Sequence, residues 1–202
     1  MSFSTPPIDL ELFRLINATL RHPFVDPVMR AVSSEAVGAV LAVAIVAYVW
    51  RRSRGRALAL VFLALLTVGV VDGSVNQFKD FFGRVRPMNA LHAVHYYEDG
   101  RWQRTEHTEA TKSHGVSYPS AHAANSMALA VTLMWLWPAG RPWILGLPLF
   151  VGYSRIYLGK HYPTDVLAGW LFGAAAALVL LQLAWTCAHI LSRRRNQTTS
   201  RA

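Results

Sequence analysis

The sequence has few charged residues and only one cysteine. Charged side chains make up 15% of the 202 residues, whereas a soluble globular domain has about 25%, so a soluble protein is disfavoured. Cys187 lies within an apolar segment, which excludes an intramolecular disulfide and a cysteine-based metal cluster. Residues 1–13 lack the basic start and long apolar run of a cleavable signal, and none is expected. The length fits a single domain, residues 1–202.

Acidic residues are also scarce, with 11 Asp and Glu against 20 Lys and Arg, which gives a formal net charge of +9. A basic chain can bind nucleic acid, but here much of the positive charge flanks apolar runs, at residues 51–56 and 192–201. That placement is typical of cytoplasmic anchors of transmembrane helices. We therefore expect no nucleic-acid partner, and we expect the 51–56 loop and a basic tail, residues 192–202, to be cytoplasmic.

Apolar residues form 53% of the chain and gather in candidate membrane spans. The spans cover residues 33–50, 57–78, 122–137, 143–157 and 164–191. A helix needs about 20 apolar residues to cross a bilayer, so the second and fifth spans are long enough and the third and fourth are short. A turn with two prolines and a glycine makes those two an antiparallel pair. The sequence predicts an all-α integral membrane helical bundle with about five to six transmembrane helices.

The N-terminal residues 1–30 are predicted to be an interfacial amphipathic segment, because Leu10, Phe13 and Ile16 share one helical face. An odd number of spans and a cytoplasmic tail place this segment outside the cytoplasm, together with the loop 79–121. That loop is rich in Lys and Arg, against the usual bias toward positive cytoplasmic loops. We attribute its charge to the chemistry of an active site.

Two charged residues near the second span have open roles. Asp72 lies inside the span, where an ionisable side chain is a functional candidate by default, but pairing with Asn76 or a nearby arginine is favoured. Arg84 follows the span, and it either lines the entrance of a site or is an ordinary interfacial charge.

Three polar blocks interrupt the apolar pattern, at residues 79–87, 118–126 and 154–165. The first ends span two, the second begins span three, and the third joins spans four and five. All three blocks are therefore expected to meet at one face of the membrane.

These blocks supply donors for a compact anion. The cations are Lys79, Arg86 and Arg155. Ser120 follows a proline as a helix N-cap, so the backbone amides of Ala121 and His122 are expected to point outward. Arginine presents a planar donor fork that matches phosphate oxygens. The arrangement favours a phosphate-binding site.

Two histidines and a carboxylate complete the candidate site. His161 precedes Pro163, a favourable first-turn residue, and Asp165 follows within that turn. A carboxylate there can accept a proton from one ring nitrogen of His161, which leaves the other nitrogen free as a nucleophile. His122 is then a candidate general acid for the leaving oxygen.

The three blocks resemble the motifs of the type 2 phosphatidic acid phosphatase (PAP2) family, membrane lipid phosphate phosphatases that share a core with vanadium haloperoxidases. The family pattern is Lys, six residues, Arg-Pro; then Pro-Ser-Gly-His; then Ser-Arg, five residues, His, three residues, Asp. The matching positions here are Lys79, Arg86, Pro87, Pro119, Ser120, His122, Ser154, Arg155, His161 and Asp165. The departure is Ala121 in place of the usual glycine.

The resemblance implies a mechanism for this chain. His161 attacks phosphorus to form a phosphohistidine, and Asp165 orients it. His122 protonates the leaving group and then activates water. The phosphate oxygens are held by Lys79, Arg86, Ser120, Ala121 and Arg155. No metal and no other cofactor is expected.

The favoured substrate is the membrane lipid undecaprenyl diphosphate, met at the periplasmic side of a bacterial inner membrane. Phosphatidylglycerol phosphate and the phosphates of lipid A are the alternatives, since the motifs contact phosphate and not the lipid tail. A non-catalytic lipid-phosphate binder or transporter is an alternative of another class, although binding alone needs only the cations. A vanadate-dependent haloperoxidase is disfavoured by the apolar spans.

Overall fold

The computed structural model describes residues 5–199. Residues 1–4 of the predicted interfacial segment and 200–202 of the predicted basic tail lie outside the described part. The N-terminal half contains α1 (Pro7–Arg14), a π-helical turn (Leu15–Thr19), α2 (Asp26–Val32), α3 (Glu35–Arg52), α4 (Arg54–Phe82) and α5 (Pro87–Ala90). The remainder contains β1 (His95–Glu98), β2 (Arg101–Arg104), α6 (Ala121–Leu136), a 3-10 turn (Pro138–Gly140), α7 (Arg141–Ile144), α8 (Gly146–Tyr157) and α9 (Pro163–Thr199).

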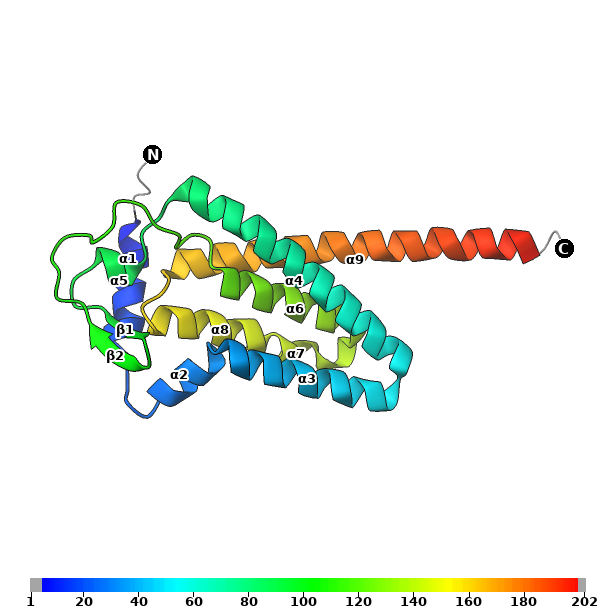
Figure 1. Ribbon diagram of the computed structural model, residues 1–202, viewed down its shortest axis with the longest axis horizontal. Coiled ribbons are helices and arrows are strands. Elements are labelled where there is room, and N and C mark those ends of the chain that lie inside the picture. Colours follow the sequence, from blue (N-terminus) through cyan, green and yellow to red (C-terminus); the bar gives the residue numbers. More distant parts are fainter. Residues whose placement is uncertain (1–4, 200–202) are drawn as a thin grey trace.

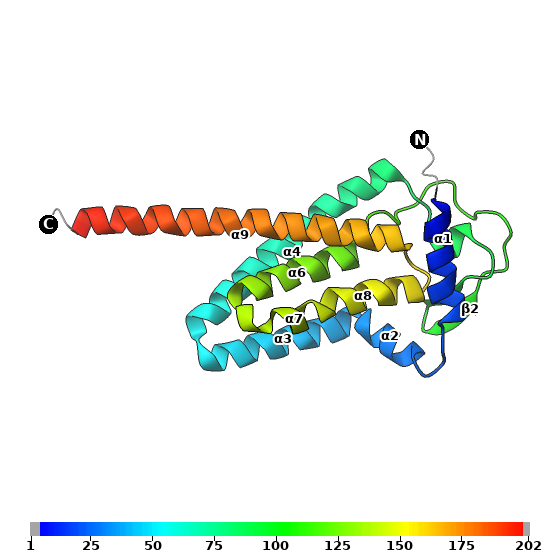
Figure 2. The same ribbon diagram turned by 180° about the vertical axis from the view of Figure 1, so that it is seen from behind.

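The long helices lie side by side as a bundle, and the shorter elements gather at one end of it. Helix α6 is central and packs against α9, α4 and α8. Figure 1 shows α1, α5 and the β-hairpin at the end from which α6 and α9 start, while α9 extends past the other end of the bundle. The reverse view shows α1 lying across that end (Figure 2). The three polar blocks of the sequence therefore lie at the end of the bundle that carries α1.

Helix starts follow their capping residues. Ser34 precedes α3, and its side chain accepts a hydrogen bond from the amide of Val37 at 3.5 Å. Ser120 caps α6 in the same way, with Ala123 as the donor at 3.4 Å. Pro163 occupies the first position of α9, where its missing amide proton costs nothing.

Membrane-spanning potential is strongest in two helical stretches. Within the described residues, Ala57–Ala90 and Pro163–Ile190 are long and apolar enough to cross a membrane, and the pair Asp26–Val32 and Glu35–Arg51, bent by 62°, is a further possible span. Large apolar side chains on α4 and α9 are exposed, such as Phe62 and Leu171, as lipid contact requires. The count of five to six spans stays a prediction. Helix α8 covers most of the expected span 143–157, and a one-residue break at Leu145 separates it from α7.

The structure corrects the purely helical expectation in the loop 79–121. Helix α4 continues to Phe82, and the loop contains an antiparallel hairpin of β1 and β2. Asp99 and Gly100 form the turn with φ angles of 51° and 79°, the left-handed conformation that Asp-Gly hairpin turns require. This Asp-Gly pair, flanked by aromatic residues, was a signal for a hairpin in the sequence.

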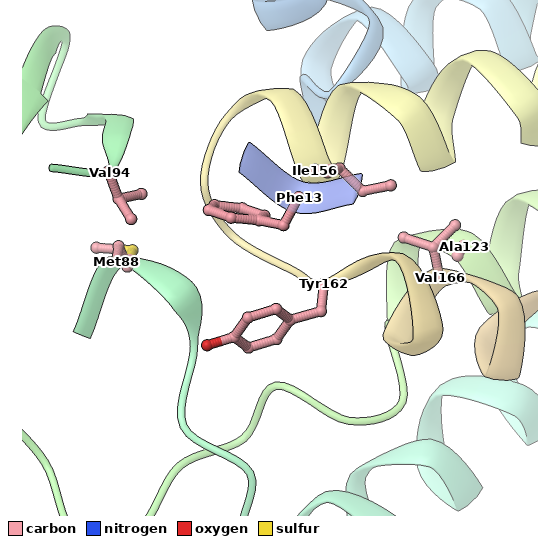
Figure 3. Packing of buried hydrophobic residues seen from close by; sticks show 7 residues of the cluster. All are labelled: Phe13, Met88, Val94, Ala123, Ile156, Tyr162 and Val166. Atoms are coloured by element: carbon pink, nitrogen blue, oxygen red, sulfur yellow. The ribbon is translucent and has the colours of Figure 1, made fainter. Parts of the chain in front are cut away.

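Helix α1 is fixed to the bundle by buried side chains. Phe13 is 1% exposed and packs against Tyr162 with ring centroids 5.6 Å apart, within a cluster that includes Ile156 and Val166 (Figure 3). Asn17, also buried, donates to the carbonyl of Tyr157 at 2.9 Å. The N-terminal segment thus contacts both α8 and the loop that carries His161.

Candidate active site

The predicted phosphate-binding cations come together at this end of the bundle. Lys79 lies in the last turn of α4, Arg86 just before α5, and Arg155 in the last turn of α8. They lie close enough for each to repel the others electrostatically. The Nε atoms of Arg86 and Arg155 are buried and have no hydrogen-bond partner within residues 5–199. Buried donors without acceptors are costly, and an anion among these side chains would supply the acceptors.

A polar pair ties α4 to α6 beside the cations. Asp72 accepts a hydrogen bond from the side chain of Asn125 at 3.2 Å. Asn76, an expected partner of Asp72, instead accepts from Lys79 at 3.1 Å. This link is consistent with the structural role favoured for Asp72. Its partner, Asn125, lies on α6, whereas the expected partner Asn76 lies on α4.

The start of α6 is held against α9. Ser120 is fully buried, and its amide donates to the carbonyl of Asp165 at 3.0 Å. Its hydroxyl caps the helix, as the sequence predicts. Ala121 and His122 follow as the first residues of α6, so their amides lie in the first turn, where they have no intrahelical acceptor.

His161 is fixed by a backbone carbonyl. Its Nδ1 lies 2.9 Å from the backbone carbonyl oxygen of Ser117. Oδ2 of Asp165 is farther from the same nitrogen, at 3.6 Å. A carbonyl oxygen can only accept, so this contact requires the proton on Nδ1 and leaves a lone pair on Nε2. The sequence predicts orientation by Asp165. The structure adds Ser117, which is buried and holds both residues, since its hydroxyl donates to Asp165 at 2.6 Å.

His122 lies near the same cations and faces outward more than His161. Its side chain is 33% exposed, and its Nε2 is 4.0 Å from a carboxylate oxygen of Glu35 at the start of α3. Its electrostatic neighbours include Arg155 and His161. The structure therefore brings the two predicted catalytic histidines together, with the more exposed one placed for proton exchange with water.

Arg84 is the residue that sequence reasoning misplaced. It neither lines an entrance nor lies at an interface, because it is 2% exposed. Its guanidinium bridges Asp9 of α1 and Asp165 of α9, with both N–O distances at 2.5 Å. The only signal in the sequence was a third basic residue within the first polar block. Its acidic partner Asp9 is 75 residues away and gave no signal.

We expect kcat/KM to decline only at unusually low pH. Burial, partly offset by the nearby carboxylate of Asp165, lowers the pKa of His161 from 6.5 to about 4. As a nucleophile it must be neutral, so we expect kcat/KM to hold from neutral pH down to about 5 and fall with a midpoint near 4. A midpoint near 6.5 would contradict this environment.

The same shift predicts how stability depends on pH. Between 6.5 and about 4 the unfolded chain binds a proton at His161 that the folded chain does not, so stability should fall as pH is lowered across that window. Thermal unfolding of wild type and His161→Ala over this range measures it. The slope should be smaller in the variant.

A glycine on α9 sets how closely α6 approaches. A Cβ at Gly169 would lie 2.5 Å from the carbonyl oxygen of Ser120 and 3.0 Å from Cβ of Ala123. Gly169→Ala should move the start of α6 away from His161, and we expect kcat/KM to fall about 10–100-fold. Gly73→Ala, where a Cβ meets nothing within 4 Å, is the matched control. Equal activity in the two variants would refute the effect.

A bundle with apolar outer faces, whose end carries half-buried cations around two histidines, defines a membrane protein with a site for an anionic group. The profile of the PAP2 superfamily matches residues 56–188, which include all three polar blocks. The chain belongs to the PAP2 superfamily. The predicted resemblance is confirmed.

Relatives and a solved structure agree with this assignment. The undecaprenyl-diphosphatase of Sulfolobus acidocaldarius is 31% identical over 64% of this chain and 57% of its own length. The lipid A 4′-phosphatase of Bacteroides thetaiotaomicron is 30% identical over 82% of this chain and 72% of its own length. The crystal structure of Aquifex aeolicus LpxE has a TM-score of 0.65 and 26% identity, and covers 90% of this chain and 99% of that chain. The chain thus spans little more than half of the first relative.

Proposed function

We propose that the protein is a membrane phosphatase that removes the terminal phosphate or diphosphate group of a lipid through a phosphohistidine on His161. The observation that carries this is the hydrogen bond from Nδ1 of His161 to the carbonyl of Ser117 at 2.9 Å. It leaves Nε2 unprotonated beside cations that repel one another until an anion binds. A binding protein would need the cations but not a histidine prepared in this way.

The reaction follows from these placements. Arg86, Arg155 and Lys79 hold the phosphate oxygens, with the amide of Ala121 at the start of α6. Nε2 of His161 attacks phosphorus and forms an N–P bond as the bond to the leaving oxygen breaks. His122 gives that oxygen a proton, then takes one from the water that hydrolyses the phosphohistidine. The charges are met by protein cations, and no metal is part of this proposal.

An apolar hollow supports a lipid as substrate. It has a volume of about 610 Å³ and is lined by side chains that include Met29 of α2, Ile156 of α8 and Trp170 of α9. Ile156 follows Arg155 directly, and Arg155 donates to Ser33, the residue that follows α2, at 2.6 Å. A chain lying in the hollow would therefore leave its head group close to the cations.

Among lipids we propose undecaprenyl diphosphate, hydrolysed at the periplasmic side of a bacterial inner membrane. A relative that acts on it by name is 31% identical to this chain. Lipid A is the second candidate, because a lipid A 4′-phosphatase aligns with a larger share of the chain, 82%. Phosphatidylglycerol phosphate completes the set.

The test is phosphate release by the purified protein in detergent, with EDTA present. The panel contains undecaprenyl diphosphate, lipid A, phosphatidylglycerol phosphate and phosphatidic acid. His161→Ala should be inactive, whereas His189→Ala, an exposed histidine near the far end of α9, should keep activity within about twofold. Preferred release from one lipid identifies the substrate. No release by a folded protein would reject the phosphatase and favour the binder.

A further inference from the structure

We propose that Asp9, on the N-terminal helix α1, is a positioning residue for the catalytic pair, because it neutralises Arg84 and so leaves the charge of Asp165 available to His161. The inference rests on the proposed roles of His161 and Asp165. It assigns a function in the reaction to a helix that lies outside all three motif blocks and outside the matched residues 56–188.

Asp9 is buried and makes several specific polar contacts. It is 1% exposed, and its Oδ2 lies 2.5 Å from Nη2 of Arg84. Thr164, the second residue of α9, donates its amide to Oδ1 at 2.9 Å and its hydroxyl to Oδ2 at 2.6 Å. Asp9 therefore holds both the arginine and the first turn of the helix that carries Asp165.

Arg84 passes this constraint to the catalytic carboxylate. Its Nη1 donates to Oδ1 of Asp165 at 2.5 Å and to Thr164 at 2.7 Å. The guanidinium also lies over the ring of Tyr162, 4.0 Å from its centroid. The other oxygen of Asp165, Oδ2, accepts from the hydroxyl of Ser117 at 2.6 Å and the amide of Tyr162 at 2.9 Å, and lies 3.6 Å from Nδ1 of His161. One carboxylate oxygen is thus held by the arginine, and the second faces the nucleophile.

The net charge of the group formed by Asp9, Arg84 and Asp165 explains the role proposed for Asp9. Arg84 and Asp165 alone would form a neutral pair, with the carboxylate charge drawn toward the guanidinium. With Asp9 included, the buried group carries one net negative charge. An imidazole that attacks phosphorus becomes cationic, and a net negative group beside it stabilises that cation where burial weakens screening.

Among residues 5–199, the other charged groups that act on His161 most strongly are cations. The charged and titratable groups that face it are Arg86 before α5, His122 on α6, Arg155 on α8 and Asp165 on α9. Two of these are cations, so the negative group formed with Asp9 is the main opposing charge within the described residues.

The experiment compares Asp9→Asn with Asp26→Asn. The amide in Asp9→Asn keeps the shape and removes the charge. Asp26 is a matched control, since it is also a buried carboxylate of the N-terminal segment, but it contacts Arg21 at 2.8 Å and Tyr157 at 2.7 Å, away from the catalytic pair. Asp9→Glu keeps the charge and serves as the conservative variant.

We expect Asp9→Asn to lower kcat about 10–100-fold with KM within about threefold. It should also move the acid limb of kcat/KM to lower pH, because a less negative neighbour makes His161 harder to protonate. Asp26→Asn should lower thermal stability and leave the limb in place, and Asp9→Glu should restore the limb.

An unmoved limb in Asp9→Asn, with kcat equal to that of Asp26→Asn, would overturn the inference, as would equal losses in Asp9→Asn and Asp9→Glu. His161→Ala is measured in parallel. If that variant keeps activity, the proposed function itself fails, whatever Asp9→Asn does.

Discussion

Replacing His161 with alanine is expected to lower phosphate release about 10⁴–10⁶-fold, the largest effect of any single substitution in the chain. We expect no other side chain to replace the proposed nucleophile. His122 is the other histidine of the site, and it begins a different helix, α6. What remains in the variant is the binding of phosphate by cations, which should keep KM or the Kd for inorganic phosphate nearly unchanged.

The covalent intermediate gives this prediction a direct readout. Wild type that is quenched during turnover should carry phosphate in a bond that survives alkali and breaks in acid, as a phosphohistidine does. The His161→Ala variant should carry none. Labelled phosphate at another residue, or equal labelling in the variant, would show that a different side chain attacks phosphorus.

His122→Ala should separate the two chemical steps. With an aryl phosphate such as nitrophenyl phosphate, the leaving group needs no protonation, so His161 should still be phosphorylated. Water activation is lost, so the phosphohistidine should accumulate, with a burst of one nitrophenol per enzyme followed by slow release. With a lipid substrate the loss should be about 10²–10⁴-fold. Equal losses on both substrates would argue against His122 as the acid.

The residues proposed to bind phosphate could be singled out in the sequence because each lies in a short block with fixed spacing. Arg155 and His161 are joined by one helix end and one turn, so local geometry settles their relation. The same holds for Ser120 and His122. Convergence of the blocks also followed from the order of the helices, since each block lies at the same predicted end of a span.

The partners of those residues were not predictable, because they are set by long-range packing. Arg84 looks in sequence like one more cation of the block, yet it is buried between carboxylates that lie 75 and 81 residues away. Asp9 belongs to a helix that hydrophobic spacing places on the membrane surface. Ser117 acts partly through its carbonyl, which no side-chain pattern records. Each requires knowledge of which elements meet.

Arg84 and Arg155 provide the second prediction, since the buried Arg84 and the half-buried Arg155 should respond to the same substitution in opposite ways. Arg155 lies among cations, and within residues 5–199 its Nε has no partner. Its facing carboxylate, Glu35, is 90% exposed and therefore weakly effective. Arg155→Met removes a desolvated charge that the fold does not compensate, so we expect the melting temperature to rise by about 2–4 °C.

Activity should move the other way in Arg155→Met. Loss of the donor fork removes charge stabilisation in the transition state, and kcat/KM should fall about 10³-fold or more. Inorganic phosphate should raise the melting temperature of wild type by binding only the folded state, and this rise should disappear in the variant. Arg155→Lys keeps the charge without the planar donor fork, so its kcat/KM should lie between those of wild type and Arg155→Met.

Arg84→Met is the contrast, because Arg84 is buried and two carboxylates compensate its charge. Removing it leaves Asp9 and Asp165 facing each other without a cation, at 0% exposure of both side chains. Breaking such a group costs about 3–5 kcal/mol, a fall in melting temperature on the order of 10 °C. Thermal unfolding of both variants in one detergent decides the matter. If Arg155→Met loses as much stability as Arg84→Met, the cations of the site are balanced in the free protein, and the argument that they await an anion fails.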